Sequence, residues 1–338
     1  MPHPTIRDVA KKAGVGVGTV SRVLNNNPNV TGATRERILQ AIAELGFKPN
    51  RVARQLPRKT RVQNIGVITQ PFINYEAFAE RMRGVQMALN EQQPRYELVL
   101  YSVSSLSHFD EQLTTIVQTD AVDGLVVIDL DLTPAQLTLL RSANVPFVGL
   151  NHFQTRDWPC IGADDAQGGY LATRALVDLG HRDIAYLADS FDDPFLFTTS
   201  QQRYEGYCQA LAEAGVAVQE TYVRLCAHDY DIARSMALEL LNLPQPPSAV
   251  FAMCDLFALA CLDAARGHGL RVPEDVSVIG FDDIAMSYHV GLSTVRQHFD
   301  AAGRMALEHL LRLIAGEETP PPRLPPLEVV LRQTTRAV

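Results

Sequence analysis

This sequence lacks cysteines in CxxC spacing, and it lacks long apolar runs. No run of eighteen or more apolar residues occurs, so no membrane span is expected. Met1 leads directly into a polar, basic segment without an apolar signal region, which predicts a cytoplasmic protein. The cysteines are few, odd in number and without CxxC spacing, and in a reducing compartment we expect them to be buried small apolar residues. They are Cys160, Cys208, Cys226, Cys254 and Cys261.

Recognisable catalytic motifs are missing as well. The sequence contains no nucleophile elbow, no HExxH and no phosphate-binding loop. The glycines of 14–18 mimic a nucleotide-binding loop, but no strand precedes them. We therefore predict no enzyme activity, no cofactor and no metal. An enzyme or a sugar-binding transport protein remains the alternative. A transport protein, however, would need a signal sequence and would have no use for the basic head.

Lysine is absent after residue 59, and the charge is divided unevenly along the chain. Residues 1–61 hold twelve Lys or Arg against three Asp or Glu, a net charge of +9. The remainder holds eighteen against thirty-five, a net charge of −17. A short basic head on an acidic body is typical of a polyanion-binding module.

The head has the pattern of three helices. Thr5 can cap a first helix that Gly14 ends, a second runs from about Val17 to Asn25, and Thr31 can cap a third. Two short helices joined by a glycine-containing turn, with a third packed on both, form a helix-turn-helix unit. The basic head is therefore predicted to bind DNA.

In such units the second helix enters the major groove with its N-terminal residues near the base edges. That geometry predicts a reading face on one side of the helix, and Arg22 on it can donate to guanine O6 and N7 together. Threonines near main-chain amides are suited to phosphate contacts. The predicted base-reading residues are Val17, Gly18, Ser21 and Arg22, and the predicted phosphate contacts are Thr5, Thr19 and Thr34.

Residues 5–56, from TIRDVAKKAGVGVGTVSRVLN through PNRVARQL, closely resemble the DNA-binding head of the lactose/galactose repressor family. The resemblance implies that residues 50–56 form a hinge helix on operator binding, with Leu56 as a minor-groove wedge. Pro57 should end that helix, and Gly16 departs from the family's usual Ser. The resemblance extends the predicted DNA contacts to Asn25, Asn50, Ala53, Arg54 and Leu56.

From Asn64 onward, short apolar runs alternate with longer amphipathic segments, which indicates parallel sheets covered on both faces. The body also resembles the family's periplasmic-binding-protein-like core. The expected fold is α/β, with an all-α head and a core of two doubly wound parallel-sheet lobes. The expected division is a DNA-binding domain at 1–49, a hinge and linker at 50–61, and an effector-binding and dimerisation core at 62–338. Within the core we expect an N-lobe of 62–161 and 292–322 and a C-lobe of 162–290 and 323–338.

Ligands on such sheets bind beyond the carboxyl ends of the strands. Strand ends and family motifs together indicate a polar site with aromatic side chains, which suits a sugar-like effector. Asn151 and Cys254 stand where the family has Asp and Asn. The predicted effector residues are Tyr75, Phe78, Asn151, Asp164, Arg203, Cys254, Asp255, Asp282, Gln297 and Phe299.

The resemblance predicts a transcription regulator, most simply a repressor, located with the nucleoid. Its expected partners are double-stranded operator DNA, a small sugar effector and a second copy of the chain. A two-fold dimer would match a palindromic operator. The chain ends soon after Leu331 without a leucine-heptad tail, so no tetramerisation helix is expected.

Overall fold

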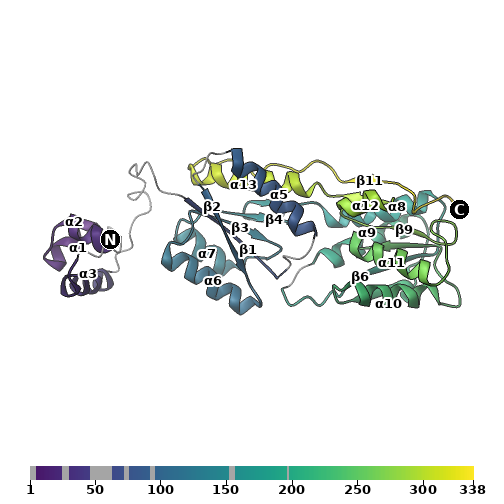
Figure 1. Ribbon diagram of the computed structural model, residues 1–338, viewed down its shortest axis with the longest axis horizontal. Helices are drawn as coiled ribbons and strands as arrows, with labels where there is room; N and C mark the ends of the chain where they lie inside the picture. Colours follow the sequence, from purple (N-terminus) through teal and green to yellow (C-terminus); the bar gives the residue numbers. More distant parts are fainter. Residues whose placement is uncertain are drawn as a thin grey trace. The chain divides into compact units, whose positions relative to one another are not determined.

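The computed structural model describes most of the chain, in seven stretches (Figure 1). Contacts divide the chain into two compact units, Met1–Arg61 and Val62–Val338. No helix within the described stretches is long and apolar enough to cross a membrane. The stretches are 5–24, 30–45, 63–71, 76–91, 96–151, 157–195 and 198–338. Six predicted site residues lie outside them: Asn25, Asn50, Ala53, Arg54, Leu56 and Tyr75.

The first unit contains the three predicted helices, α1 (Ile6–Ala13), α2 (Val17–Leu24) and α3 (Gly32–Leu45). At the start of α1, the Asp8 carboxylate accepts from the backbone N–H of Thr5 at 2.7 Å and from its hydroxyl at 2.6 Å. These bonds fix the first turn of the helix. The small core of the unit is made by Val9, Ala10, Ala13, Val20, Val23, Ile38 and Ala41.

The N-lobe is a five-stranded parallel sheet in the order β2-β1-β3-β4-β5. Alternate residues of its central strand serve two cores, because Leu125 and Val127 pack with α6 and α7 while Val126 and Ile128 pack with α5 and α13. Burial on both faces explains why the strand is continuously apolar. The elements are β1 (Gln63–Thr69), α5 (Glu76–Glu91), β2 (Tyr96–Ser102), α6 (Leu106–Thr119), β3 (Gly124–Ile128), α7 (Pro134–Ser142), β4 (Phe147–Leu150), β5 (Cys160–Ile161) and α13 (Phe299–Ile314).

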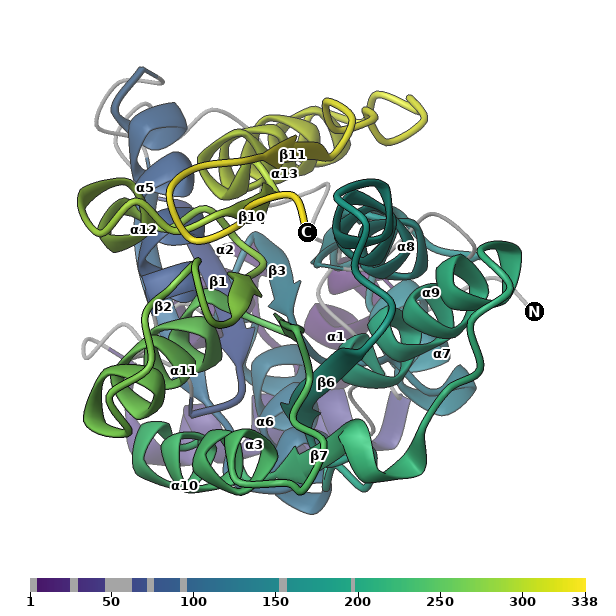
Figure 2. The same cartoon turned by 90° about the vertical axis from the view of Figure 1, so that its right-hand side faces the viewer.

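The C-lobe is a four-stranded parallel sheet in the order β7-β6-β8-β9. Helices α8 and α9 lie on one side of this sheet and α10 and α11 on the other (Figure 2). The elements are α8 (Asp165–Asp178), β6 (Ile184–Asp189), α9 (Thr199–Glu213), the 3-10 helix η1 (Glu220–Tyr222), β7 (Val223–Cys226), α10 (Tyr230–Leu241), β8 (Ala249–Ala252), α11 (Asp255–Gly267), β9 (Ser277–Ile279) and α12 (Ala285–His289).

The return from the C-lobe to the N-lobe comes a few residues after the expected lobe boundary at residue 292. The backbone N–H groups of Gly280 and Asp282 donate to the carbonyls of Ser293 and Val295, both at 2.8 Å. These bonds hold β10 (Thr294–Arg296) beside the C-lobe sheet. The chain therefore crosses after β10, and α13 then packs on α5 in the N-lobe.

The last segment returns to the C-lobe. Strand β11 (Glu328–Val330) pairs antiparallel with β10. Beyond it, the N–H of Val278 donates to the carbonyl of Thr334 at 2.7 Å, and the N–H of Val338 donates to the carbonyl of Leu179 at 2.9 Å. The two lobes are thus joined by connections that lie close together, an arrangement that permits hinge motion.

Candidate functional site

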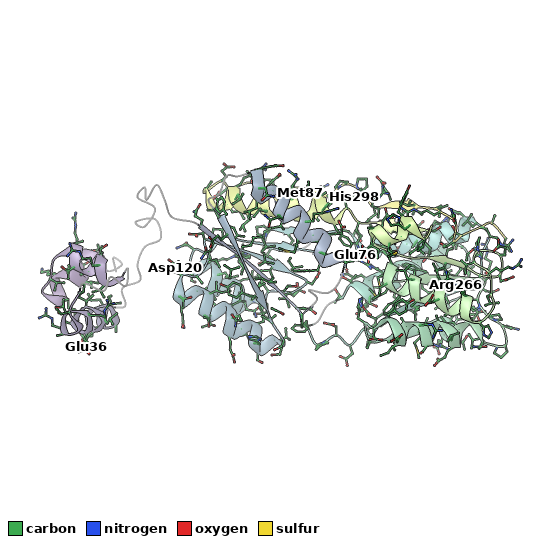
Figure 3. All side chains as sticks on the ribbon, in the orientation of Figure 1. Glu36, Glu76, Met87, Asp120, Arg266 and His298 are labelled. Atoms are coloured by element: carbon green, nitrogen blue, oxygen red, sulfur yellow. The ribbon has the colours of Figure 1, made fainter. Side chains whose placement is uncertain are left out.

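A cavity of about 710 Å³ lies between the two lobes, at the carboxyl ends of their strands. Its walls come from the ends of β1, β3, β4, β6, β7 and β8 and from the starts of α5, α9 and α13. Glu76, at the start of α5, lies on the side of the N-lobe that faces the C-lobe (Figure 3). The volume falls within the ~300–1,000 Å³ typical of small-molecule sites. This is the position at which doubly wound sheets bind ligands.

Seven of the predicted effector residues line this cavity: Phe78, Asn151, Arg203, Cys254, Asp282, Gln297 and Phe299. Two others are not among its lining residues. Asp164 is the N-cap of α8, where its carboxylate accepts from the backbone N–H of Gln167 at 2.9 Å. Asp255 is buried and accepts from the hydroxyls of Ser287 and Thr294, both at 2.6 Å. Both aspartates therefore organise the backbone around the cavity.

The C-lobe wall is centred on Arg203, which is buried. Its Nε and Nη2 lie 2.8 and 2.7 Å from Oδ1 of Asp165, and its Nη1 donates to the carbonyl of Met253 at 2.5 Å. Burial alone would lower the pKa of Arg203, but Asp165 and Asp282 together raise it. The guanidinium stays charged and is held in one orientation by these contacts.

Asp282 stands beside Arg203, with 3.9 Å between its Oδ1 and the Nη1 of the arginine. Gln297 donates from Nε2 to the same Oδ1 at 2.6 Å, and this links the C-lobe wall to the segment that enters α13. Burial raises the pKa of Asp282 to about 6, against the opposing effect of Arg203. Its φ is 128°, a conformation that costs of order 1–3 kcal/mol in an L residue. Such strain is commonly found at functional sites.

The N-lobe wall is built on Asp129, which follows β3 and has a φ of 55°. One of its carboxylate oxygens, Oδ1, accepts from Nδ2 of Asn151 at 2.6 Å, and the other lies 3.4 Å from Nη1 of Arg81. Gln70 donates from Nε2 to the backbone carbonyl of Asp129 at 2.6 Å. The Arg81 guanidinium also lies over the Phe299 ring, with Cζ 4.5 Å from the centroid. A charged pair thus lies against an aromatic platform.

Several lining residues were not among the predicted ones: Gln70, Arg81, Asp129, Asp189 and His228. Asp129 and Asp189 sit at the ends of strands, so the rule that identified Asn151 could have identified them too. The Oδ2 of Asp189 and the Nδ1 of His228 lie 2.8 Å apart. Arg81 lies within helix α5 and not at the end of a strand, so the strand-end rule could not have identified it.

The five cysteines form no disulfide with one another; Cys208 is half-buried and the other four are buried. Cys254 belongs to the cavity wall, and burial raises the pKa of its thiol well above the usual value. It therefore presents a small neutral group there. Among the described residues, no group of three or more His, Cys, Asp or Glu side chains is placed to hold a metal ion.

In the head, the predicted reading face of α2 is open to solvent. Val20 and Val23 are buried against the neighbouring helices, whereas Val17, Gly18 and Arg22 are exposed. Ser21 and Thr19 are half-buried at the edges of this face. Of the other predicted contacts, Thr5 is exposed, and Thr34 is half-buried and accepts from the Thr31 hydroxyl at 2.9 Å.

Comparison with known proteins assigns both parts of the chain. Residues 5–50 match the model for bacterial regulatory proteins of the lacI family, and residues 173–335 match that of a periplasmic binding protein-like domain. The chain is 36% identical to the transcriptional regulator CelR of Thermobifida fusca, over 95% of both chains. The chain belongs to the LacI family. It is also 31% identical to catabolite control protein A of Priestia megaterium, over 93% of both.

Solved LacI-family structures resemble the whole chain. The CelR–cellobiose complex matches with a TM-score of 0.69 at 32% identity, covering 98% of this chain and 99% of that one. The lac repressor dimer bound to operator matches with a TM-score of 0.71 at 28% identity, covering 99% and 100%. The predicted fold and the predicted class, a DNA-binding transcription regulator with an effector-binding core, are confirmed. The relatives named here are regulators and not enzymes.

Proposed function

We propose that this LacI-family protein is a repressor that binds a palindromic operator as a homodimer and is controlled by a sugar in the inter-lobe cavity. The observation that carries the sugar assignment is the composition of the cavity wall. Asp282, Asn151 and Gln297 offer donors and acceptors, and Phe78 and Phe299 offer apolar faces. Sugar hydroxyls both donate and accept, and sugar rings carry apolar faces that pack on aromatic rings.

The proposed DNA contacts are the exposed residues of α2 and the predicted hinge. Arg22 reads a guanine from the major groove, and Leu56, which lies outside the described residues, enters the central minor-groove step. A similar protein, CelR, has been solved with cellobiose, and the lac repressor has been solved as a dimer on operator DNA. These relatives support both the sugar effector and the two-fold assembly.

The sensing mechanism follows from the two walls of the cavity. A ligand that touches Asn151 and Phe299 on one side and Arg203 and Asp282 on the other has contacts with both lobes. It therefore favours one angle between the lobes and biases the hinge helices that precede each N-lobe. Couplings of this kind are typically worth 1–3 kcal/mol.

The test uses the full chain and an operator selected from a pool of palindromic duplexes. Fluorescence anisotropy should show salt-dependent, sequence-specific binding whose affinity changes about 5- to 150-fold when cellobiose is added. Binding that is equal for selected and scrambled duplexes would refute the regulator assignment at this head. Specific binding that no mono- or disaccharide changes would refute the sugar effector alone.

Arg22→Ala should weaken binding to the selected operator by about 1–3 kcal/mol and relax the base preference at one position. Arg37→Ala removes another exposed arginine, on α3 and outside the reading face, and serves as the control. It should weaken selected and scrambled duplexes alike. If both variants lose the same affinity for both duplexes, Arg22 does not read a base.

A further inference from the structure

The cavity wall carries more acid than base. Among the described lining residues, six carboxylates face two guanidiniums. An anion entering such a site meets a negative potential unless a guanidinium is available to it. The carboxylates belong to Glu76, Asp129, Asp189, Asp192, Asp193 and Asp282, and the guanidiniums to Arg81 and Arg203.

Arg203 is already engaged on the protein side. Its Nε and Nη2 are directed to Asp165, which is not among the lining residues, and its Nη1 to the carbonyl of Met253. All three side-chain nitrogens of Arg203 therefore already have partners within the protein. Its charge is further offset by Asp282 at 3.9 Å.

The charge of Arg81 is balanced by the carboxylate of Asp129. The ion pair described for it joins Nη1 to Oδ2 of Asp129 at 3.4 Å, with the two side chains only 6% and 5% exposed. Asp129 is held in place by Nδ2 of Asn151 and by Nε2 of Gln70. Both members of the pair line the cavity, so Asp129 cancels the charge of Arg81 at the surface that a ligand touches.

We propose that the Arg81–Asp129 pair determines the charge specificity of the effector site. With Asp129 paired to Arg81, the cavity accepts neutral polyhydroxylated ligands and rejects sugars that carry a carboxylate or a phosphate. Without the charge of Asp129, Arg81 becomes an anion-binding group inside the same cavity. This proposal rests on the proposed function, since it specifies which sugars the sensing site takes.

The experiment compares cellobiose with cellobiouronate, which has a carboxylate in place of one hydroxymethyl group and is otherwise the same size. Titration calorimetry on the full wild-type chain should give a Kd for cellobiouronate at least about tenfold weaker. In Asp129→Asn the cellobiouronate-to-cellobiose affinity ratio should rise about tenfold or more. Asparagine suits this position because it tolerates positive φ and keeps an acceptor for Asn151.

Asp192→Asn is the matched control, because it removes one negative charge from the lining of the same cavity without exposing an arginine. In this variant the cellobiouronate-to-cellobiose affinity ratio should change about threefold at most, as expected of an exposed charge. Arg81→Gln is the opposite change, and it should move the ratio toward cellobiose. The proposal is overturned if wild-type protein prefers the anion, if Asp192→Asn equals Asp129→Asn, or if Arg81→Gln moves the ratio the other way.

Inorganic phosphate provides a probe that does not depend on any sugar. At constant ionic strength, phosphate should raise the Tm of Asp129→Asn and leave that of the wild type unchanged. Equal responses would overturn the proposal. If wild-type protein binds operator but neither disaccharide, the sugar effector of the proposed function fails, while the phosphate result still decides the role of Asp129.

Discussion

The guanidinium of Arg203 lies over the ring of Phe281, with its Cζ 3.7 Å from the ring centroid. The opposite wall repeats the arrangement, since Arg81 lies over Phe299 with Cζ 4.5 Å from the centroid. Each lobe thus supplies an arginine that is stacked on a phenylalanine and paired with an aspartate. Stacking and ion pairing together fix a guanidinium more firmly than either does alone. The walls of the cavity are therefore preorganised before a ligand arrives.

Replacing Arg203 should abolish the effector response and destabilise the core. Arg203→Gln leaves Asp165 buried without its partner, a loss that typically costs about 3–5 kcal/mol. Urea denaturation should show this loss, and operator binding below the transition should persist without responding to sugar. Arg174→Gln, which breaks an exposed pair with Asp178, should change neither property. An Arg203→Gln protein that keeps the wild-type sugar response would remove this arginine from the site.

The stability of the core should depend on pH through Asp282. Its pKa is raised from 3.8 to about 6 in the folded protein, so the folded state binds the proton more tightly than the unfolded state. The contribution of Asp282 to stability is therefore greatest below about pH 4 and decreases as pH rises to about 6. Asp282→Asn should remove that decrease, a difference of order 1–3 kcal/mol between the two proteins.

The measurement is urea denaturation of both proteins at several pH values from 4 to 8. The difference in unfolding free energy should change mainly within the window of about pH 4 to 6. A further change should extend to about pH 8, because the charge of Asp282 helps to raise the pKa of the buried Asp255 to about 8 and its removal lowers that pKa. Asp193→Asn alters a neighbouring carboxylate of the same wall and should follow the wild-type curve. A constant difference between Asp282→Asn and wild type would mean that Asp282 titrates normally.

Gly303 should be required for the position of Arg81. Helices α5 and α13 cross so closely that a Cβ at Gly303 would collide with the backbone carbonyl of Arg81. Gly303→Ala must push the helices apart, at a cost of about 1–3 kcal/mol or more. It should also weaken sugar binding, because Arg81 moves relative to Phe299. Thermal denaturation and calorimetry measure the two effects.

Gly267→Ala is the control for Gly303→Ala. A Cβ at Gly267 would meet only the flexible end of the Arg234 side chain, at 3.3 Å. Since alanine is a better helix former than glycine, this change should leave the Tm equal or slightly higher. If Gly303→Ala behaves in the same way, the close helix crossing is not required.

Tyr288 should belong to the dimer interface. It is 74% exposed, and Val290 and Leu331 nearby are also exposed. The segment of Leu331 is held against that of Val290, because the N–H of Gln333 donates to the carbonyl of Gly291 at 2.8 Å. Tyr288→Asp places a charge in this apolar surface and should shift the protein toward monomer in sedimentation velocity. Operator affinity should fall with it.

Leu106→Asp is the matched change elsewhere on the core. Leu106 is 38% exposed at the first turn of α6, where an acidic residue is favourable to the helix. It should leave the dimer intact. A Tyr288→Asp protein that sediments as the wild type does would place the interface on another surface.

Local patterns in the sequence were enough for much of this structure. The cap at Thr5, the break at Gly14 and the spacing of Val20 and Val23 predicted the head, since they depend only on near neighbours in the chain. Continuous apolar runs predicted parallel sheets, and the strand-end rule predicted Asn151 and Asp282 as cavity residues. The family resemblance, carried mainly by residues 5–56, was likewise present in the sequence alone.

Tertiary structure decided which charged side chains pair with one another. Nothing local in the sequence connects Arg81 with Asp129, forty-eight positions later, or Arg203 with Asp165 on a different helix. Asp164 and Asp255 satisfied the sequence rules for the site, yet their carboxylates turn to backbone and hydroxyl donors nearby. Periodicity shows which face of a helix is buried, but the crossing of α5 and α13 determines what that face meets. The fold was therefore predictable from the chain, and the charge pairing of its cavity was set by helix packing.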